Sequence, residues 1–174
     1  MIEILGNFGR RWEHEVNMRL NPRETPDSVF RPTDAELILD FLIRKIKNET
    51  MSRNLIKVVD NVYHFHPENL PDHYGENRAE EWLFFAPRDM EHENEEIRNG
   101  VGVNGYWQVT GENDETIKQN DETIGFRRTL EFYKGNPPND DKTSWIMHEI
   151  RLNDQLATDD TENIPQGLQM VGRE

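Results

Sequence analysis

Five short runs of aromatic and aliphatic residues, separated by polar turns, follow one another along the chain from residue 82 onward. They are Trp82–Phe85, Gly105–Val109, Thr123–Phe126, Leu130–Tyr133 and Ser144–Met147. Runs of this length and composition are typical of β-strands, and several in succession indicate one antiparallel sheet. Two prolines at the centre of Asn136–Asp141 predict a turn, so the last two strands should pair as a hairpin with a long loop.

A helix is expected before the first of these strands. Thr33, followed three residues later by Glu36, forms a capping-box pattern, which places a helix start just after Pro32. Apolar residues then recur at helical spacing from Leu37 to Ile46, which predicts an amphipathic helix of about four turns. A second, short helical turn is expected around Pro67–Pro71, with Pro71 stopping it.

The chain of 174 residues is long enough for one domain with a sizeable core. We divide it into an N-terminal arm at residues 1–27, a folded domain at 28–153 and a polar tail at 154–174.

The chain has no cysteine, which excludes disulfides and thiolate metal sites. No apolar run reaches the length of about 18 residues that a membrane span needs, and no signal peptide is recognisable, so we expect a protein inside the cell.

The negative charge is concentrated in the middle of the sequence. The net charge is −14, and residues 61–120 carry four basic against thirteen acidic residues, a net charge of −9. Such a surface repels polyanions such as DNA and attracts basic proteins, although acidic surfaces often serve solubility alone.

Several separated blocks, in order over residues 28–152, resemble the plant NAC domain, a DNA-binding module of transcription factors. The blocks begin with Phe30–Leu37 and Val62–Pro71 and continue with Glu81–Asp89, Gly105–Gly111, Phe132–Pro138 and Lys142–Leu152. The resemblance implies an α+β fold: a twisted antiparallel β-sheet flanked by a few helices, which dimerises near its N-terminal end. It also implies that one strand edge enters the major groove of double-stranded DNA, which is wide enough to accept a β-ribbon.

The resemblance assigns the DNA-reading strand to the segment that begins at Trp107. The residues implied there are Trp107, Gln108, Val109, Thr110 and Gly111, with phosphate contacts expected from Arg88, Arg98, Arg127, Arg128 and Lys142. Arg127 and Arg128 match a basic pair of the family, but neighbouring strand residues face opposite ways and cannot both serve one groove.

The match weakens at the positions that should contact DNA. Gln108 stands where the family usually has a basic residue, and Glu112-Asn113-Asp114 stands where it has Thr-Asp-Lys. Each lost phosphate contact removes one released counterion, so several losses lower affinity by orders of magnitude at physiological salt.

The implied dimer surface is altered as well. It comprises Val29, Phe30, Arg31 and Glu36. Val29 stands where the family has an arginine, and the resemblance implies that this arginine pairs with a carboxylate at the position of Glu36. Arg31 is a candidate to replace that arginine. For Glu36 we favour the capping box as its role.

The leading hypothesis is a divergent NAC-type transcription regulator of the nucleus with weakened DNA contact, able to form homo- or heterodimers with other NAC proteins. The alternative is a NAC-fold interaction module that has given up DNA. No pattern of catalytic residues or of metal ligands recommends an enzyme or a cofactor.

Overall fold

The computed structural model describes residues 32–50, 56–75, 81–87, 95–99, 103–156 and 167–173. By its internal contacts the chain divides into Met1–Pro32 and Thr33–Glu174, and the fold below is that of the second unit. None of the helices in the described ranges has the length and apolar character that crossing a membrane requires.

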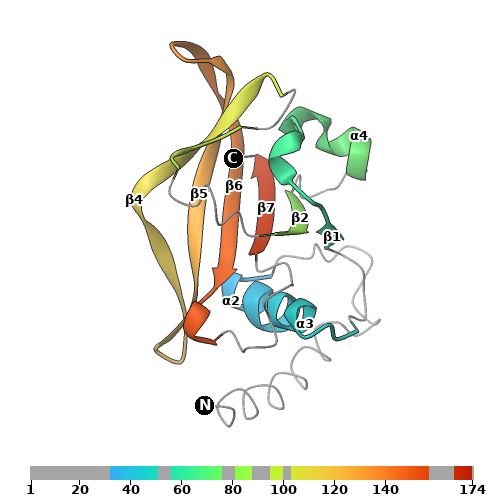
Figure 1. Ribbon diagram of the computed structural model, residues 1–174, viewed down its shortest axis with the longest axis vertical. Coiled ribbons are helices and arrows are strands. Elements are labelled where there is room, and N and C mark those ends of the chain that lie inside the picture. Colours follow the sequence, from blue (N-terminus) through green and yellow to red (C-terminus); the bar gives the residue numbers. More distant parts are fainter. Residues whose placement is uncertain are drawn as a thin grey trace. The chain divides into compact units, whose positions relative to one another are not determined.

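A seven-stranded sheet, in the order β1-β2-β7-β6-β5-β4-β3, forms the body of this unit (Figure 1). Among the strands that the structure describes, β1 and β2 pair in parallel and the other neighbouring pairs are antiparallel. The expected α+β fold, a twisted antiparallel sheet with a few flanking helices, is confirmed. The strands are β1 (Lys57–Val58), β2 (Glu81–Ala86), β3 (Ile97–Arg98), β4 (Gly105–Gln119), β5 (Glu122–Asn136), β6 (Asn139–Leu152) and β7 (Gly167–Arg173).

The three longest strands, β4, β5 and β6, are joined by two tight hairpins. The β4–β5 loop is Asn120-Asp121, and both residues have a positive φ, 49° and 66°, as a two-residue hairpin turn requires. The β5–β6 hairpin is also confirmed, but its loop is Pro137-Pro138 alone, because Asn136 already pairs with Asn139. The prediction of a long loop between these two strands is therefore wrong.

β5 is one strand, where the sequence predicted two. The residues between the two aromatic runs, Arg127–Thr129, pair with Ile150, Glu149 and His148 of β6. Their polar side chains made this stretch look like a turn, but each is only half-buried and finds a polar partner on a neighbouring strand.

β7 corrects our assignment of residues 154–174 to a polar tail. Gly167–Arg173 lies between β2 and β6 in the interior of the sheet and pairs with both. The two neighbouring strands satisfy the backbone of this central strand, and Val171, 1% exposed, anchors it in the core. A strand of this kind lacks the period-two apolar pattern on which sequence reasoning depends.

The predicted helix is confirmed as a continuous run of α2 (Asp34–Glu36), the π-helical η1 (Leu37–Leu42) and α3 (Ile43–Ile46). The capping box is present: Thr33 Oγ1 accepts a hydrogen bond from Glu36 N, and Glu36 Oε2 accepts one from Thr33 N at 2.8 Å. Leu37, Ile38 and Leu42 are fully buried. An ideal Cβ on Gly125 would lie 2.4 Å from Ile38 Cδ1, so glycine makes room for the helix against β5.

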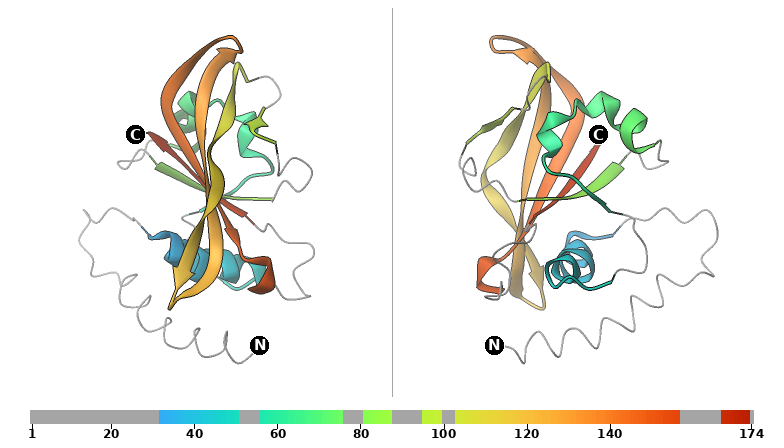
Figure 2. Two further views of the ribbon diagram at one scale, coloured as in Figure 1. Left: turned by 90° about the vertical axis from the view of Figure 1, so that its left-hand side faces the viewer. Right: turned by 45° about the vertical axis from the view of Figure 1, so that its right-hand side comes forward.

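The second helical segment covers the other face of the sheet. It comprises η2 (Val62–His64), η3 (Pro67–Asn69) and α4 (Leu70–Tyr74) and lies at the opposite end of the long strands from α2 and α3 (Figure 2). Pro71 does not stop this helix; it stands in the first turn of α4, where its missing N–H has no partner to lose.

The two helical segments bury opposite faces of β2. Phe84 belongs to the main core cluster with Tyr63, Leu70 and Trp107, whereas its neighbour Phe85 lies 5.6 Å from the Lys45 ammonium of α3. Both rings are 0% exposed. Since adjacent strand residues point to opposite faces, β2 is covered on both sides.

Candidate nucleic-acid interface

The strand expected to read DNA begins inside the core. Gly105 has φ 151°, and a Cβ there would lie 2.4 Å from the Tyr133 carbonyl oxygen, so glycine is required. Trp107 is 2% exposed, pairs in register with Phe132 and holds its ring 5.1 Å from the Phe132 ring. Its side chain therefore positions the strand from within.

Exposure increases along β4 after Trp107. Gln108, Val109 and Thr110 are half-buried, and Gly111 is exposed. The outer edge of β4 is covered by β3 opposite Trp107 and Gln108, and Val109 N donates to Glu96 O at 2.8 Å. Among the strands that the structure describes, none pairs with this edge from Thr110 onward.

A wide bulge follows Thr110. Thr110 pairs with Thr129 and Glu115 pairs with Arg127, so the four residues from Gly111 to Asp114 stand opposite Arg128 alone. Gly111 has φ 83°, a left-handed conformation that glycine adopts without a steric penalty. Bulges of this kind bend a strand and redirect its side chains, and this one brings Asp114 over β5 and β6.

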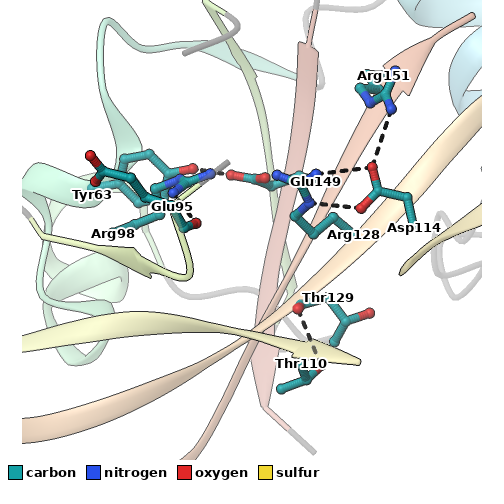
Figure 3. A network of polar contacts seen from close by, with 9 residues as sticks. All are labelled: Tyr63, Glu95, Arg98, Thr110, Asp114, Arg128, Thr129, Glu149 and Arg151. Carbon is teal, nitrogen blue, oxygen red and sulfur yellow. Dashed lines mark hydrogen bonds and ion pairs between the residues drawn. The ribbon is translucent and has the colours of Figure 1, made fainter. Parts of the chain in front are cut away.

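Asp114 binds two arginines from neighbouring strands (Figure 3). Arg128 Nε donates to Asp114 Oδ1 at 2.7 Å and Arg128 Nη2 donates to Oδ2 at 3.1 Å; Arg151 Nη2 donates to the same Oδ2 at 3.2 Å. Burial by itself would raise the pKa of Asp114, but the hydrogen bonds and charges of Arg128 and Arg151 outweigh it and lower that pKa. The carboxylate is therefore charged at neutral pH and neutralises part of this cluster.

Arg127 faces the other side of the sheet and is also ion-paired. Its Nη1 lies 2.9 Å from Asp34 Oδ2 of α2, and its Nη2 lies 2.6 Å from Glu115 Oε2 of β4. The two neighbouring arginines of β5 thus face opposite ways, and each has carboxylate partners.

The other described cations of the predicted site are engaged too. Lys142 Nζ lies 2.7 Å from Glu131 Oε2 across the β5–β6 hairpin, although 57% of the lysine side chain is exposed. Arg98 is 4% exposed and donates to the carbonyl of Glu95. It lies beside Tyr63, which donates a hydrogen bond to Glu149 and whose pKa is raised by burial and by that carboxylate. Arg98 therefore anchors β3 to the core.

Four predicted residues, Arg88, Val29, Phe30 and Arg31, lie outside the described residues. Glu36 takes the capping role that we favoured for it.

Sequence reasoning missed the acidic partners of these cations. None of Asp34, Asp114, Glu115 and Glu131 was identified from the sequence as a partner of these cations, and Arg151 was assigned no role. The glycine at 111, followed by three polar residues within a strand pattern, was the one available signal of a bulge.

Comparison with known proteins identifies the family. The sequence model of the No apical meristem (NAM) protein family matches residues 25–152. The chain belongs to this family, the NAC family.

Relatives with NAC names cover most of the chain. NAC transcription factor 29 of Arabidopsis thaliana is 41% identical over 144 residues, which are 79% of this chain and 50% of the relative. NAC domain-containing protein 96 of the same plant is 39% identical over 140 residues, 80% of this chain and 48% of the relative. NAC domain-containing protein 1 of Solanum lycopersicum is 41% identical over 134 residues, 76% of this chain and 46% of the relative. This NAC chain thus spans about half the length of these relatives.

Proposed function

We propose that this NAC chain acts in the plant nucleus as a transcription regulator and that its own contact with double-stranded DNA is weak. Membership of the family, and relatives that are named transcription factors, support the regulatory role. The strand segment Gln108–Gly111 is the part of β4 that reaches the major groove in this proposal, with Trp107 holding it in place from the core.

One observation supports the proposal that DNA contact is weakened: the described cations of the predicted phosphate-binding site already have partners within the chain. Arg127 and Arg128 bind carboxylates at 2.6–2.9 Å, Lys142 binds one at 2.7 Å, and Arg98 is buried. A phosphate would have to displace a carboxylate from each arginine, whereas a free arginine only exchanges a mobile counterion for the phosphate.

The consequence is a shallow salt dependence. Each phosphate that a protein neutralises steepens the fall of log affinity with log salt by about 0.9 in B-DNA. With three of its cations internally neutralised, this domain should bind duplex DNA weakly and with a slope of small magnitude.

Selection from a randomised duplex pool, repeated over a salt series, tests this proposal. The stretch of NAC transcription factor 29 that matches this chain provides the reference under the same conditions. We expect enrichment of a shared short motif, with lower affinity and a shallower salt slope than the reference. A slope and affinity equal to the reference would contradict the weakened contact.

The same ion pairs favour a second candidate, a NAC-fold interaction module that does not bind DNA. The acidic middle of the chain suits a basic partner protein, and NAC proteins themselves are candidate dimer partners. Absence of any enriched motif, together with negligible binding at low salt, would favour this candidate. Sedimentation of the chain over a concentration series then reports whether it dimerises.

A further inference from the structure

Arg128 and Arg151 form a two-arginine fork on one face of the sheet. Arg128 comes from β5 and Arg151 from β6, and the register places them on neighbouring rungs, since Arg128 pairs with Glu149 and Phe126 with Arg151. Both donate to one carboxylate, that of Asp114. The contacts from Arg128 have the bidentate geometry with which arginine also binds phosphate.

Each arginine has a neighbour other than Asp114 on the same face of the sheet. The Arg151 guanidinium lies 4.3 Å from the centroid of the Phe126 ring. Arg128 lies opposite Glu149, which is itself fixed by the hydroxyl of Tyr63. The fork should therefore persist when the Asp114 carboxylate is removed.

The charges of this cluster balance only because Asp114 is present. Arg128 and Arg151 carry two positive charges, and Asp114 and Glu149 carry two negative charges. Removing the Asp114 charge leaves a net positive site that is partly open, because the side chains of Arg128 and Arg151 are 19% and 26% exposed. An anion of carboxylate or phosphate size is what such a site binds.

We propose that Asp114 is an internal competitor for DNA phosphate: the bulge of β4 places its carboxylate in the Arg128–Arg151 fork, which binds a phosphodiester oxygen once the carboxylate is absent. This inference rests on the proposed DNA contact and gives a reason for its weakness. The bulge makes the competition possible, since a regular β4 would place one residue, not four, opposite Arg128.

Binding of the whole chain to duplex DNA over a salt series tests the competition. Asp114→Asn removes the charge and keeps the shape. Glu112→Gln is the matched control, because it removes the same charge from an exposed position two residues away on the same strand. The double variant D114N/R151Q removes the carboxylate together with half of the fork.

One added phosphate contact should raise the affinity of Asp114→Asn about tenfold at ~0.1 M salt and steepen the salt slope by about 0.9. Glu112→Gln should stay within about twofold of the unmodified chain, since an exposed charge is screened at this salt. The double variant should lose the gain. An equal gain in Asp114→Asn and Glu112→Gln would overturn the proposal, because net charge alone would then explain it.

A second measurement separates this inference from the proposed function. Inorganic phosphate at millimolar concentration should raise the thermal midpoint of Asp114→Asn, but not that of Glu112→Gln, because a ligand that binds the native state stabilises it. Stabilisation by phosphate without any DNA binding would support the fork and reject the DNA contact. No effect of either phosphate or DNA on Asp114→Asn would overturn the fork.

Circular dichroism checks that the variants fold, and Asp114→Ser provides a second neutral replacement. If both neutral variants unfold, the carboxylate is a structural element rather than a competitor, and the proposal is overturned.

Discussion

The two halves of β4 differ in what holds them. The first half, around Tyr106 and Trp107, is fixed by aromatic packing: Trp107 contacts Phe132, and the Tyr106 and Tyr133 rings stack at 5.4 Å on the opposite face. The second half, from Gly111 to Glu115, is fixed by ion pairs to Arg127 and Arg128. A charged residue cannot replace a buried apolar one without a large cost in stability, whereas residues in partly exposed ion pairs can be exchanged one at a time. Function can therefore diverge in the second half of β4 while the fold is kept.

Removing the Trp107 side chain should destabilise the first half of β4 and have the largest effect on the free energy of unfolding. Its ring is almost fully buried, so Trp107→Ala should lower the free energy of unfolding by about 3–5 kcal/mol. Urea unfolding followed by far-ultraviolet circular dichroism measures this loss. Trp107→Phe, which keeps an aromatic ring against Phe132, should lose clearly less; equal losses would contradict the packing that we assign to this half.

Asp114→Asn should have an intermediate effect that depends on pH. At neutral pH we expect a loss of about 1–3 kcal/mol, because charge-assisted hydrogen bonds to two arginines are weakened. The pKa of Asp114 is lower in the folded chain than its ordinary 3.8, so its contribution is complete above that value and disappears as the pH falls through the folded pKa.

The difference in unfolding free energy between the unmodified chain and Asp114→Asn should therefore be constant from neutral pH to about pH 5 and shrink below about pH 4. Urea unfolding at a series of pH values measures it. A difference that stays unchanged in acid would mean that the Asp114 charge does not stabilise the bulge.

Glu112→Ala should have the smallest effect. Glu112 is exposed in the same bulge, and surface substitutions of this kind usually change stability by less than about 0.5 kcal/mol. A loss of stability as large as that of Asp114→Asn would show that the overall charge, rather than the Asp114 contacts, stabilises the second half of β4.

Much of the framework could be predicted because it depends on local signals. The capping box of Thr33 and Glu36 and the apolar spacing after it define the helix, and the aromatic runs define β2, β4 and β6. The partners of Arg127 and Arg128 could not be predicted in the same way. They depend on the register of β4 against β5, and the bulge after Thr110 shifts that register by three residues without an apolar pattern to reveal it.

The amino-acid sequence by itself determined the family, the antiparallel sheet, the helix start and the acidity of the middle of the chain, because these follow from residue order and composition. Only the tertiary structure decided that Gly167–Arg173 is a central strand and that Arg127, Arg128 and Lys142 bind this chain's own carboxylates. The physical reason is distance along the chain. Asp34 and Arg127 meet across 93 positions and Asp114 and Arg151 across 37, and only folding brings such charges together.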